Sequence, residues 1–454
     1  MQILNFRVKN HKSLRDETAL ELLDSSLTTL KPSANKTWGQ YVHTVAGIFG
    51  ANASGKSNVL DALRYFTAAI ENSSTIWQDS SSFPHVPFKL SDTSRTADSA
   101  YELDFLLDDI RYRYGFSVNS EGVNIEYLMH LPKSRWRTIF TREYVEGIDS
   151  VDFIARDVKK LEVSHRELVL SRAATLGRKD ILGSVAHAIT HKIDFVLLSE
   201  RDQQMRIEAI INALVELSIT RDDIAQLLQV ADIGIQKVDI WQSEDNLDVD
   251  NLPQDMPRTV QQMILQILAT EQNSAADSNA KLIQRRLEFF HNSADSNSPP
   301  LYLSDESDGT LAWLAISFAV LEALRTGKVV CGDELDSSLH PHLVRLIISL
   351  FTDPSVNTRG AQLIFTTHDA TILHHYEELG LSTESIWFTE KDRDGSTELF
   401  SLSDFPKITG ANIEKRYLSG RYGAVPFVAH SIFWKILEDK NQKLAQIEDM
   451  NHGS

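Results

Sequence analysis

Apolar and polar residues alternate along the first 150 positions in a pattern that predicts strands around one helix. Ile3–Val8 and Val42–Phe49 read as short strands, and apolar residues recur at helical spacing from Val59 to Ile70. Polar turns separate three further alternating runs, which predict an antiparallel meander: Tyr101–Leu107, Tyr112–Val118 and Val123–Leu128. The segment is therefore expected to be rich in strands.

The next 150 residues change to a helical pattern. Long runs such as Val185–Leu198 and Met205–Leu217 predict helices, whereas the acidic stretch Glu244–Asp255 predicts a solvated loop. We interpret this segment as a helical insertion that divides one domain in two. An independent middle domain fits the same pattern equally well.

An α/β pattern returns from Leu301. A helix is predicted over Leu311–Leu324, and the continuous apolar run Val329–Gly332 after it is typical of a parallel strand buried on both faces. A further helix near 343–350 and a strand over Gln362–Thr366 follow.

These patterns predict the α/β fold class and a division of the chain into four parts. Residues 1–150 and 301–405 would form the two halves of one domain, and 151–300 the mainly helical insertion. Residues 406–454 would form a C-terminal helical tail that binds a partner.

Composition narrows the class of protein. The chain has 454 residues, and its apolar runs are too short to span a bilayer. Its N-terminus lacks the pattern of a secretory signal, and the single Cys331 excludes an internal disulfide and a multi-cysteine metal site. We therefore expect a cytoplasmic protein with no membrane partner. A net charge of −18 argues against a dedicated nucleic-acid-coating protein, although 45 Lys and Arg residues leave room for a local basic patch.

One segment matches the phosphate-binding pattern G-x-x-x-x-G-K-[ST]. In such a loop, backbone N–H groups wrap the phosphates and the following helix adds its positive dipole end. Lys56 is expected to reach the β and γ phosphates of ATP, and Ser57 to bind Mg²⁺. The predicted binding residues are Gly50, Ala51, Asn52, Ala53, Ser54, Gly55, Lys56, Ser57 and Asn58.

A carboxylate pair follows the apolar strand Val329–Gly332. Asp333 can hold Mg²⁺, and Glu334 can polarise the attacking water as general base. Most Asp-Glu pairs are solvated surface groups. This pair is a stronger signal because it follows a buried strand in a chain that also carries the phosphate loop.

A third segment, Glu306-Ser307-Asp308-Gly309-Thr310, opens the helix predicted over Leu311–Leu324 and lies 26 residues before Asp333, counted from Ser307. Taken alone, Ser307 would be a helix cap. At this place in the chain the segment resembles the signature loop of ABC-type ATPases, whose common form is Leu-Ser-Gly-Gly-Gln. Ser307 and Gly309 keep the Ser and the second Gly, and the other three positions depart. The resemblance implies that Ser307 and Gly309 meet the ATP of an opposite subunit, in a homodimer or a higher oligomer.

Two later segments fit the same resemblance. Leu335-Asp336-Ser337-Ser338-Leu339-His340-Pro341 is similar to the D-loop of these ATPases, and Thr366-Thr367-His368-Asp369 occupies the place of their switch histidine. A lone His at a strand end is usually structural, but this order of motifs favours contact between His368 and the γ-phosphate. A glutamine lid loop is not evident. The region Phe83–Leu90 is a candidate, but it contains no glutamine.

Two segments indicate which branch of the ABC-type ATPases this chain resembles. Both look like the RecF/SMC-related group: Asn58 directly after the phosphate loop, and the opening Phe6-Arg7-Val8-Lys9-Asn10-His11-Lys12-Ser13. The segment Arg416–Pro426 is similar to RloA/AbiL-type ATPases of anti-phage defence. That resemblance implies a regulator of an effector encoded nearby, a RloB-like (Toprim-type) nuclease or another toxin. An alternative is a RecF-type repair ATPase that clamps DNA, and a non-hydrolysing scaffold is a third.

The sequence also contains an Asp-x-Asp, Asp392-Arg393-Asp394, that could imitate a nuclease metal motif. Gly395 follows it, and Asp-Gly between apolar runs is a strong hairpin signal. We therefore predict a turn here and no nuclease within this chain.

Overall fold

The computed structural model describes residues 1–156, 158–197, 199–231, 234–246, 281–292, 298–406 and 412–423. They form two compact units. The first unit comprises Met1–Phe195, Thr326–Glu334 and the chain from Ile348 onward, and the second comprises Val196–Arg325 and Leu335–Ile347.

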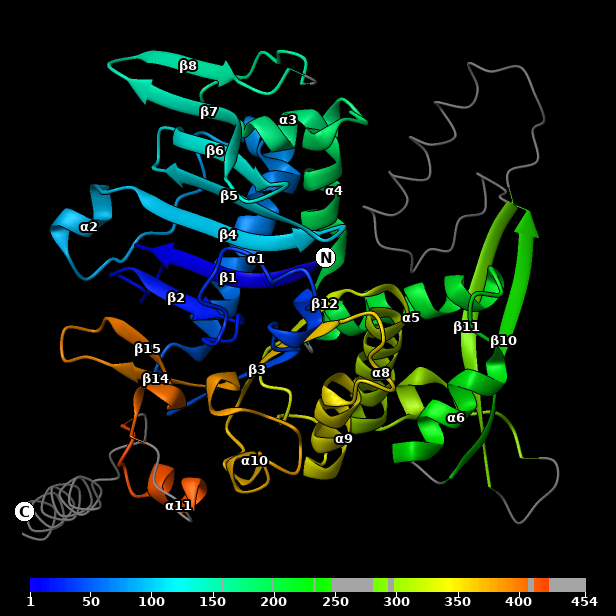
Figure 1. Ribbon diagram of the computed structural model, residues 1–454. Coiled ribbons are helices and arrows are strands. Elements are labelled where there is room, and N and C mark those ends of the chain that lie inside the picture. The colour runs from blue at the N-terminus through cyan, green and yellow to red at the C-terminus, as the bar shows by residue number, and fades with distance from the viewer. Residues whose placement is uncertain are drawn as a thin grey trace, which may run out of the picture. The chain divides into compact units, whose positions relative to one another are not determined.

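The first unit contains a seven-stranded antiparallel sheet of order β2-β1-β4-β5-β6-β7-β8 (Figure 1). Buried and more exposed side chains alternate along much of β1 and β6, as expected for a sheet covered on one face. Its strands are β1 (Gln2–Lys9), β2 (Thr18–Glu21), β4 (Ser99–Leu107), β5 (Ile110–Val118), β6 (Val123–Leu131), β7 (Arg137–Val145) and β8 (Ile148–Phe153).

A second sheet in the same unit has the order β15-β14-β3-β13-β12-β9. The four central strands that pair with one another are parallel, and the buried runs of β3, β13 and β12 show that both faces are covered. Its strands are β3 (Val45–Gly50), β9 (Ile193–Val196), β12 (Val329–Gly332), β13 (Gln362–Thr367), β14 (Ile386–Lys391) and β15 (Thr397–Ser401).

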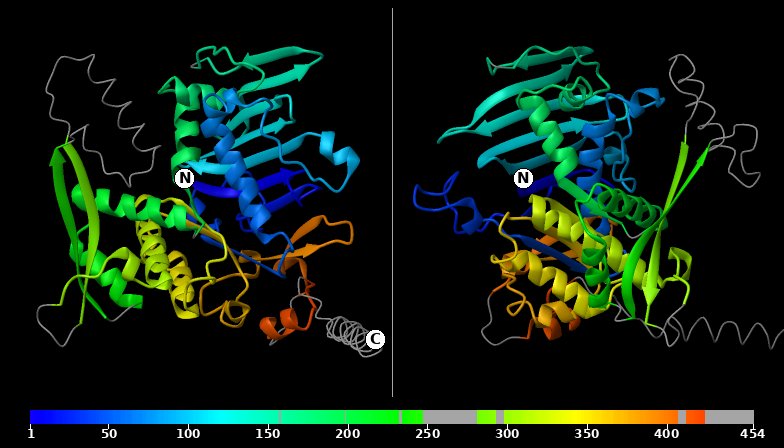
Figure 2. Two further views of the ribbon diagram at one scale, coloured as in Figure 1. Left: turned by 180° about the vertical axis from the view of Figure 1, so that it is seen from behind. Right: turned by 90° about the vertical axis from the view of Figure 1, so that its right-hand side faces the viewer.

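Helix α1 (Lys56–Asn72) joins the two sheets into one core. Its Phe66 is fully buried, and the Phe66 ring stacks on that of Phe116 in β5, with centroids 5.3 Å apart. On its other side α1 contacts β3 and β13. Helix α4 (Ile181–Lys192) runs beside α1, and Figures 1 and 2 show both on the same face of the antiparallel sheet.

Smaller helices complete the first unit. Two of them lie at the antiparallel sheet, and the others follow β13 and β15. They are α2 (Asp92–Thr96), α3 (Val169–Thr175), α10 (Thr371–His374) and α11 (Ile413–Leu418).

The second unit combines helices with a long hairpin. Strands β10 (Ile235–Asn246) and β11 (Lys281–His291) pair antiparallel, so that Val238 lies opposite Phe289 and both are buried. The helices are α5 (Glu200–Val215), α6 (Arg221–Ala231) and α8 (Asp308–Thr326). Helix α9 (Pro341–Thr352) begins in this unit and ends in the first.

Helix α8 is the one helix of the described residues that is long and apolar enough to cross a membrane by length and composition. Of its most apolar stretch of 18 residues, 56% is buried inside the protein, and buried core helices also meet this criterion. A single helix of this kind is weak evidence for a membrane segment.

The expected α/β fold is confirmed, because the chain combines an antiparallel sheet with a parallel one. Strands β2, β7 and β8 were not predicted, nor was the hairpin of β10 and β11 within the segment predicted to be mainly helical. The helix predicted over Val185–Leu198 ends at Lys192, because the β-branched and aromatic run Ile193–Val196 joins the parallel sheet as β9.

The acidic loop predicted over Glu244–Asp255 is wrong at its start, where 244–246 belong to β10. Pairing with β11 overrides the local preference of these polar residues for a loop. The rest of that loop lies outside the described residues, as does most of the tail predicted over 406–454.

Candidate functional site

Three parallel strands place the residues that were predicted to bind and hydrolyse ATP at one edge of the six-stranded sheet. Strand β13 lies between β3 and β12, so the carboxyl ends of all three meet at the same edge. Beyond these ends follow the phosphate loop, the carboxylate pair and His368. The site residues of the first unit, which are far apart in sequence, therefore lie together.

The phosphate loop leaves the N-terminus of α1 open for an anion. The N-cap of this helix is Gly55 at φ 109°, a left-handed conformation that favours glycine, and no side chain caps the helix. The first N–H groups of α1 are thus available to phosphate oxygens. Lys56 Nζ donates to the carbonyl oxygens of Gly50 and Ala51, at 2.9 and 3.1 Å, so the ammonium is held over the loop.

The carboxylate pair is fixed by one hydroxyl of β13. Thr366 Oγ1 donates to Asp333 Oδ1 at 2.6 Å and accepts the backbone N–H of Glu334 at 2.7 Å. Glu334 has φ 50°, a left-handed conformation that is uncommon for a residue other than glycine. Such a conformation persists only where surrounding contacts fix it, and it is frequent at functional sites.

His368 connects the two halves of the site. Its Nδ1 lies 3.3 Å from Lys56 Nζ, and its Nε2 lies 3.3 Å from Glu334 Oε1. The Lys56 ammonium has only donors, so Nδ1 accepts and the ring proton belongs on Nε2, directed at the Glu334 carboxylate. The imidazole is thereby oriented by both groups.

These residues border a pocket of about 770 Å³. The volume suits a nucleotide-sized ligand. The lining residues are Asn52, Ala53, Gly55, Lys56, Ser57, Asn58, Glu334, His368 and Lys391. Lys391, at the end of β14, is the one lining residue that sequence reasoning missed, because it lies in a hairpin without a motif.

Oxygen ligands for a magnesium ion are present at this edge. Ser57 offers a hydroxyl in the pocket, and Asp333 offers a carboxylate of which one oxygen is engaged by Thr366. A hydroxyl and a carboxylate are the hard donors that Mg²⁺ prefers, with phosphate oxygens and water completing its shell. The donor set therefore fits the ion that the sequence predicts.

Two threonines of the β14–β15 hairpin form hydrogen bonds with Ser54 of the phosphate loop. Thr397 Oγ1 donates to the Ser54 carbonyl at 2.8 Å and is 2.7 Å from Ser13 Oγ, which itself accepts from Asn58. Thr389 Oγ1 lies 2.6 Å from Ser54 Oγ. Sequence reasoning missed these hydrogen bonds, because strand pairing brings together residues that are more than 330 positions apart in sequence.

The predicted signature residues lie in the second unit. Ser307 Oγ accepts the Thr310 N–H at 3.1 Å at the start of α8, which is the capping role that the sequence also suggested. A Cβ on Gly309 would lie 3.6 Å from the Ser338 carbonyl oxygen, so this turn and the D-loop-like segment are neighbours. The contact with an opposite subunit stays a prediction.

Two other expectations concern loops. The Asp-x-Asp segment forms the predicted turn: Asp392 N–H donates to the Ser396 carbonyl, and Gly395 has φ 87°. The lid candidate Phe83–Leu90 instead packs beside the end of β1, where the Phe88 N–H donates to Asn10 Oδ1. A role of this segment as a lid stays untested.

Comparison with known proteins agrees with a nucleotide-binding fold. A family model described as "AAA domain, putative AbiEii toxin, Type IV TA system" matches residues 45–374. No curated protein matches. The segment matched by the family model begins at β3 and ends after His368, so it includes the phosphate loop, the carboxylate pair and the histidine.

Among solved structures, an SMC head bound to the C-terminal winged-helix domain of ScpA is 13% identical, with a TM-score of 0.42. The match covers 88% of this chain and 97% of that one. The recombination mediator protein RecF with ATP is 12% identical with a TM-score of 0.37, covering 88% and 99%. Similarity at this level carries no functional argument.

Proposed function

Because this chain belongs to the AAA-domain family whose model spans residues 45–374, we propose that it is a Mg²⁺-dependent ATP hydrolase. The reaction is ATP and water to ADP and phosphate. One observation supports this most: His368 lies 3.3 Å from both Lys56 and Glu334, so the phosphate loop and the Glu334 carboxylate border one pocket.

Each residue has a role set by its position. The open N-terminus of α1 and Lys56 hold the phosphates, while Ser57 and Asp333 would hold Mg²⁺, which would supply positive charge beside the phosphates. Glu334 orients the attacking water. His368 contacts the γ-phosphate with Nε2–H, the group that now donates to Glu334. Catalysis then consists of positioning and charge stabilisation.

The biological output is a dimer that closes around ATP and controls a partner effector. Support comes from the position of Ser307 and Gly309 at the N-terminus of α8, where each subunit could present them to the γ-phosphate bound by the other. The family description names a putative toxin of a toxin–antitoxin system, which supports a biological setting of that kind and names no separate effector. A nuclease encoded nearby, acting in anti-phage defence, is the effector we propose.

Phosphate release by the purified chain tests the proposal, measured with Mg²⁺ and ATP for wild type and Glu334→Gln. Removal of a general base typically lowers turnover by 10²- to 10⁴-fold. Equal rates in the two proteins would mean that Glu334 has no catalytic role and that ATP is structural.

The same assay with duplex DNA separates the effector hypothesis from the RecF-type alternative. A regulator of a separate effector should hydrolyse ATP at the same rate with and without DNA, as the net charge of −18 suggests. Stimulation of several-fold by DNA would favour a protein that clamps DNA directly.

A further inference from the structure

Three side chains of metal-ligating type meet outside the nucleotide pocket, in the first unit. Asp24, His43 and Glu384 each offer one ligand atom, and these atoms all lie within 4.8 Å of one another. Within the described ranges no other trio of His, Cys, Asp or Glu residues meets that criterion. None of the three belongs to the site described above.

The backbone holds the three residues from separate segments. Leu23 and Val42 form an antiparallel bridge, and beside it Asp24 N–H donates to the Tyr41 carbonyl and His43 N–H to the Leu22 carbonyl. Glu384 comes from the short helix η5 (Thr383–Ser385), directly before β14. Two segments are thus fixed by main-chain bonds, and the third by strand pairing of β14 with β3.

Hydrogen bonds orient the Glu384 carboxylate toward His43. Ser25 donates its N–H and its hydroxyl to the two oxygens, at 3.1 and 2.6 Å, and His43 Nε2 lies 3.1 Å from Oε2. The side chains of His43 and Glu384 are 16% and 26% exposed. Ligands held this way by outer hydrogen bonds are typical of metal sites.

The charge of the cluster is not balanced by lysine or arginine. Among the described residues, neither Asp24 nor Glu384 forms an ion pair with such a cation, and His43 is the partner of Glu384. The hydrogen bond from Ser26 lowers the pKa of Asp24. Burial opposes ionisation of Glu384, but hydrogen bonds from Ser25 and His43 outweigh it and lower its pKa. The two carboxylates therefore surround one imidazole without a lysine or arginine partner among the described residues.

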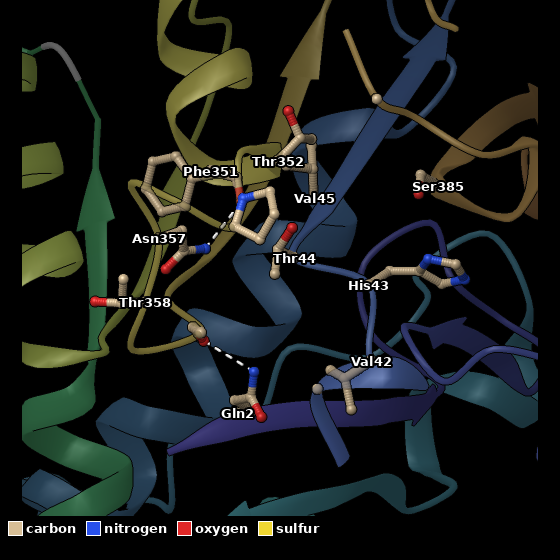
Figure 3. Close-up of a pocket in the computed structure, with 14 residues that line it drawn as sticks. Gln2, Val42, His43, Thr44, Val45, Phe351, Thr352, Asn357, Thr358 and Ser385 are labelled. Carbon is tan, nitrogen blue, oxygen red and sulfur yellow. Dashed lines mark hydrogen bonds between the residues drawn. The ribbon is translucent and has the colours of Figure 1, made fainter. Parts of the chain in front are cut away.

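Space for water lies beside the trio. A cavity of about 410 Å³ in the same unit is bordered by His43 and by Ser385, the neighbour of Glu384. Figure 3 shows His43 and Ser385 on the same side of this cavity. Water from the cavity can complete a coordination shell that three protein ligands leave open.

We propose that Asp24, His43 and Glu384 bind a divalent transition-metal ion, for which Zn²⁺ has the matching donor set. Imidazole nitrogen and carboxylate oxygen are both ligands that Zn²⁺ takes in three-ligand sites completed by water, and a nitrogen donor disfavours Mg²⁺ and Ca²⁺. The ion binds at His43 Nε2 in place of a proton, which leaves to solvent, and the neutral ring then carries its one proton on Nδ1. Two carboxylates then neutralise the ion.

The bound ion would link the segment between β2 and β3, which carries Asp24 and His43, to Glu384 directly before β14. Strand β14 pairs with β3, the strand that ends in the phosphate loop, so the bound ion stabilises the scaffold of the site without touching ATP. It therefore raises thermal stability and leaves the nucleotide chemistry to other residues.

Metal content of the full chain tests this site. The protein is purified without a histidine tag, stripped with EDTA and titrated with Zn²⁺ against a chromogenic chelator, in the absence of nucleotide. We expect one equivalent of Zn²⁺ in wild type, a rise in Tm of several degrees on its addition, and no response to Mg²⁺. Asp24→Asn, which keeps the side-chain shape, and His43→Ala should lose at least tenfold in affinity.

Two control variants outside the trio test whether Zn²⁺ binding depends on Asp24, His43 and Glu384 specifically. His375→Ala removes a half-buried histidine that pairs with Glu378 and contacts the ring of His374, away from the trio, and this variant should still bind one equivalent of Zn²⁺. Lys56→Ala should also keep it, so a failure of the ATPase proposal leaves this result intact. Wild-type protein that takes up less than about a tenth of an equivalent, or His43→Ala protein that binds as tightly as wild type, would overturn the proposal.

Discussion

At the scale of single residues, Thr366 shows how one hydroxyl can organise a site. It bonds to Asp333 and to the backbone of Glu334, and so sets the direction of both carboxylates at the end of β12. The left-handed backbone of Glu334 turns its side chain to His368. Local hydrogen bonds, more than burial, thus place the predicted base.

Thr397 is a positioning residue for the phosphate loop, and paired variants test this. Thr397→Val keeps the branched shape but removes the hydroxyl that bonds to Ser54 and Ser13. We expect KM for ATP to rise several-fold with kcat changed little, because the loop loses its preferred geometry. Loss of these buried bonds costs about 1–3 kcal/mol. Steady-state kinetics would show it.

Thr397→Ser is the matched control, since it restores the hydroxyl, and its KM should return toward that of wild type. A Thr397→Val protein that melts earlier yet has an unchanged KM would show that the residue supports only the fold.

Sequence reasoning found those site residues that lie in contiguous motifs. Lys56, Ser57 and Asp333 stand at fixed places next to apolar strands, so spacing alone identifies them. Lys391 and Thr397 could not be found in this way. They lie near the phosphate loop because β14 pairs with β3 and with β15, and no local sequence pattern predicts this pairing.

At the scale of elements, α1 depends on a buried polar cluster beside its first turns. His11 is fully buried, with Nδ1 2.9 Å from the Tyr101 hydroxyl and Nε2 2.9 Å from Asp61 Oδ2. Lys12 and Arg64 also pair with Asp61. The segment after β1 is thereby fixed to α1, the helix that follows the phosphate loop.

Burial lowers the pKa of His11, although Asp61 opposes the shift. Below the ordinary value of 6.5 the unfolded chain therefore binds more protons here than the folded chain. The free energy of unfolding should fall as pH falls through this window. His11→Asn should reduce that slope, measured by urea unfolding between pH 7 and pH 5 (about the range of histidine titration). An identical slope in the variant would contradict the assignment.

Elements with strong periodicity were predicted well, and those that depend on distant partners were not. The strand Val329–Gly332 matches the prediction at both ends, because a buried apolar run has few alternatives. β8 was missed because its polar and exposed residues form a strand only through pairing with β7. β9 was read as the end of a helix, since its place in the sheet depends on β12.

At the scale of the whole molecule, the account predicts an ATP-dependent dimer. Glu334→Gln should bind ATP without hydrolysing it and accumulate the closed form, since each subunit supplies Ser307 and Gly309 to the other. Light scattering during gel filtration would show twice the monomer mass with ATP and Mg²⁺. Ser307→Arg, which places a bulky cation at the contact, should stay monomeric. A monomeric Glu334→Gln protein at saturating ATP would argue against the shared site.

The most direct measurement of the central claim is calorimetric titration of ATP into the full chain in the presence of Mg²⁺. Wild type and Glu334→Gln should each bind one ATP per chain. Lys56→Ala should lose about 2–5 kcal/mol of binding free energy, because the phosphates lose a buried cationic partner. Wild-type protein that binds no ATP, or a Lys56→Ala protein that binds it with undiminished affinity, would contradict the account.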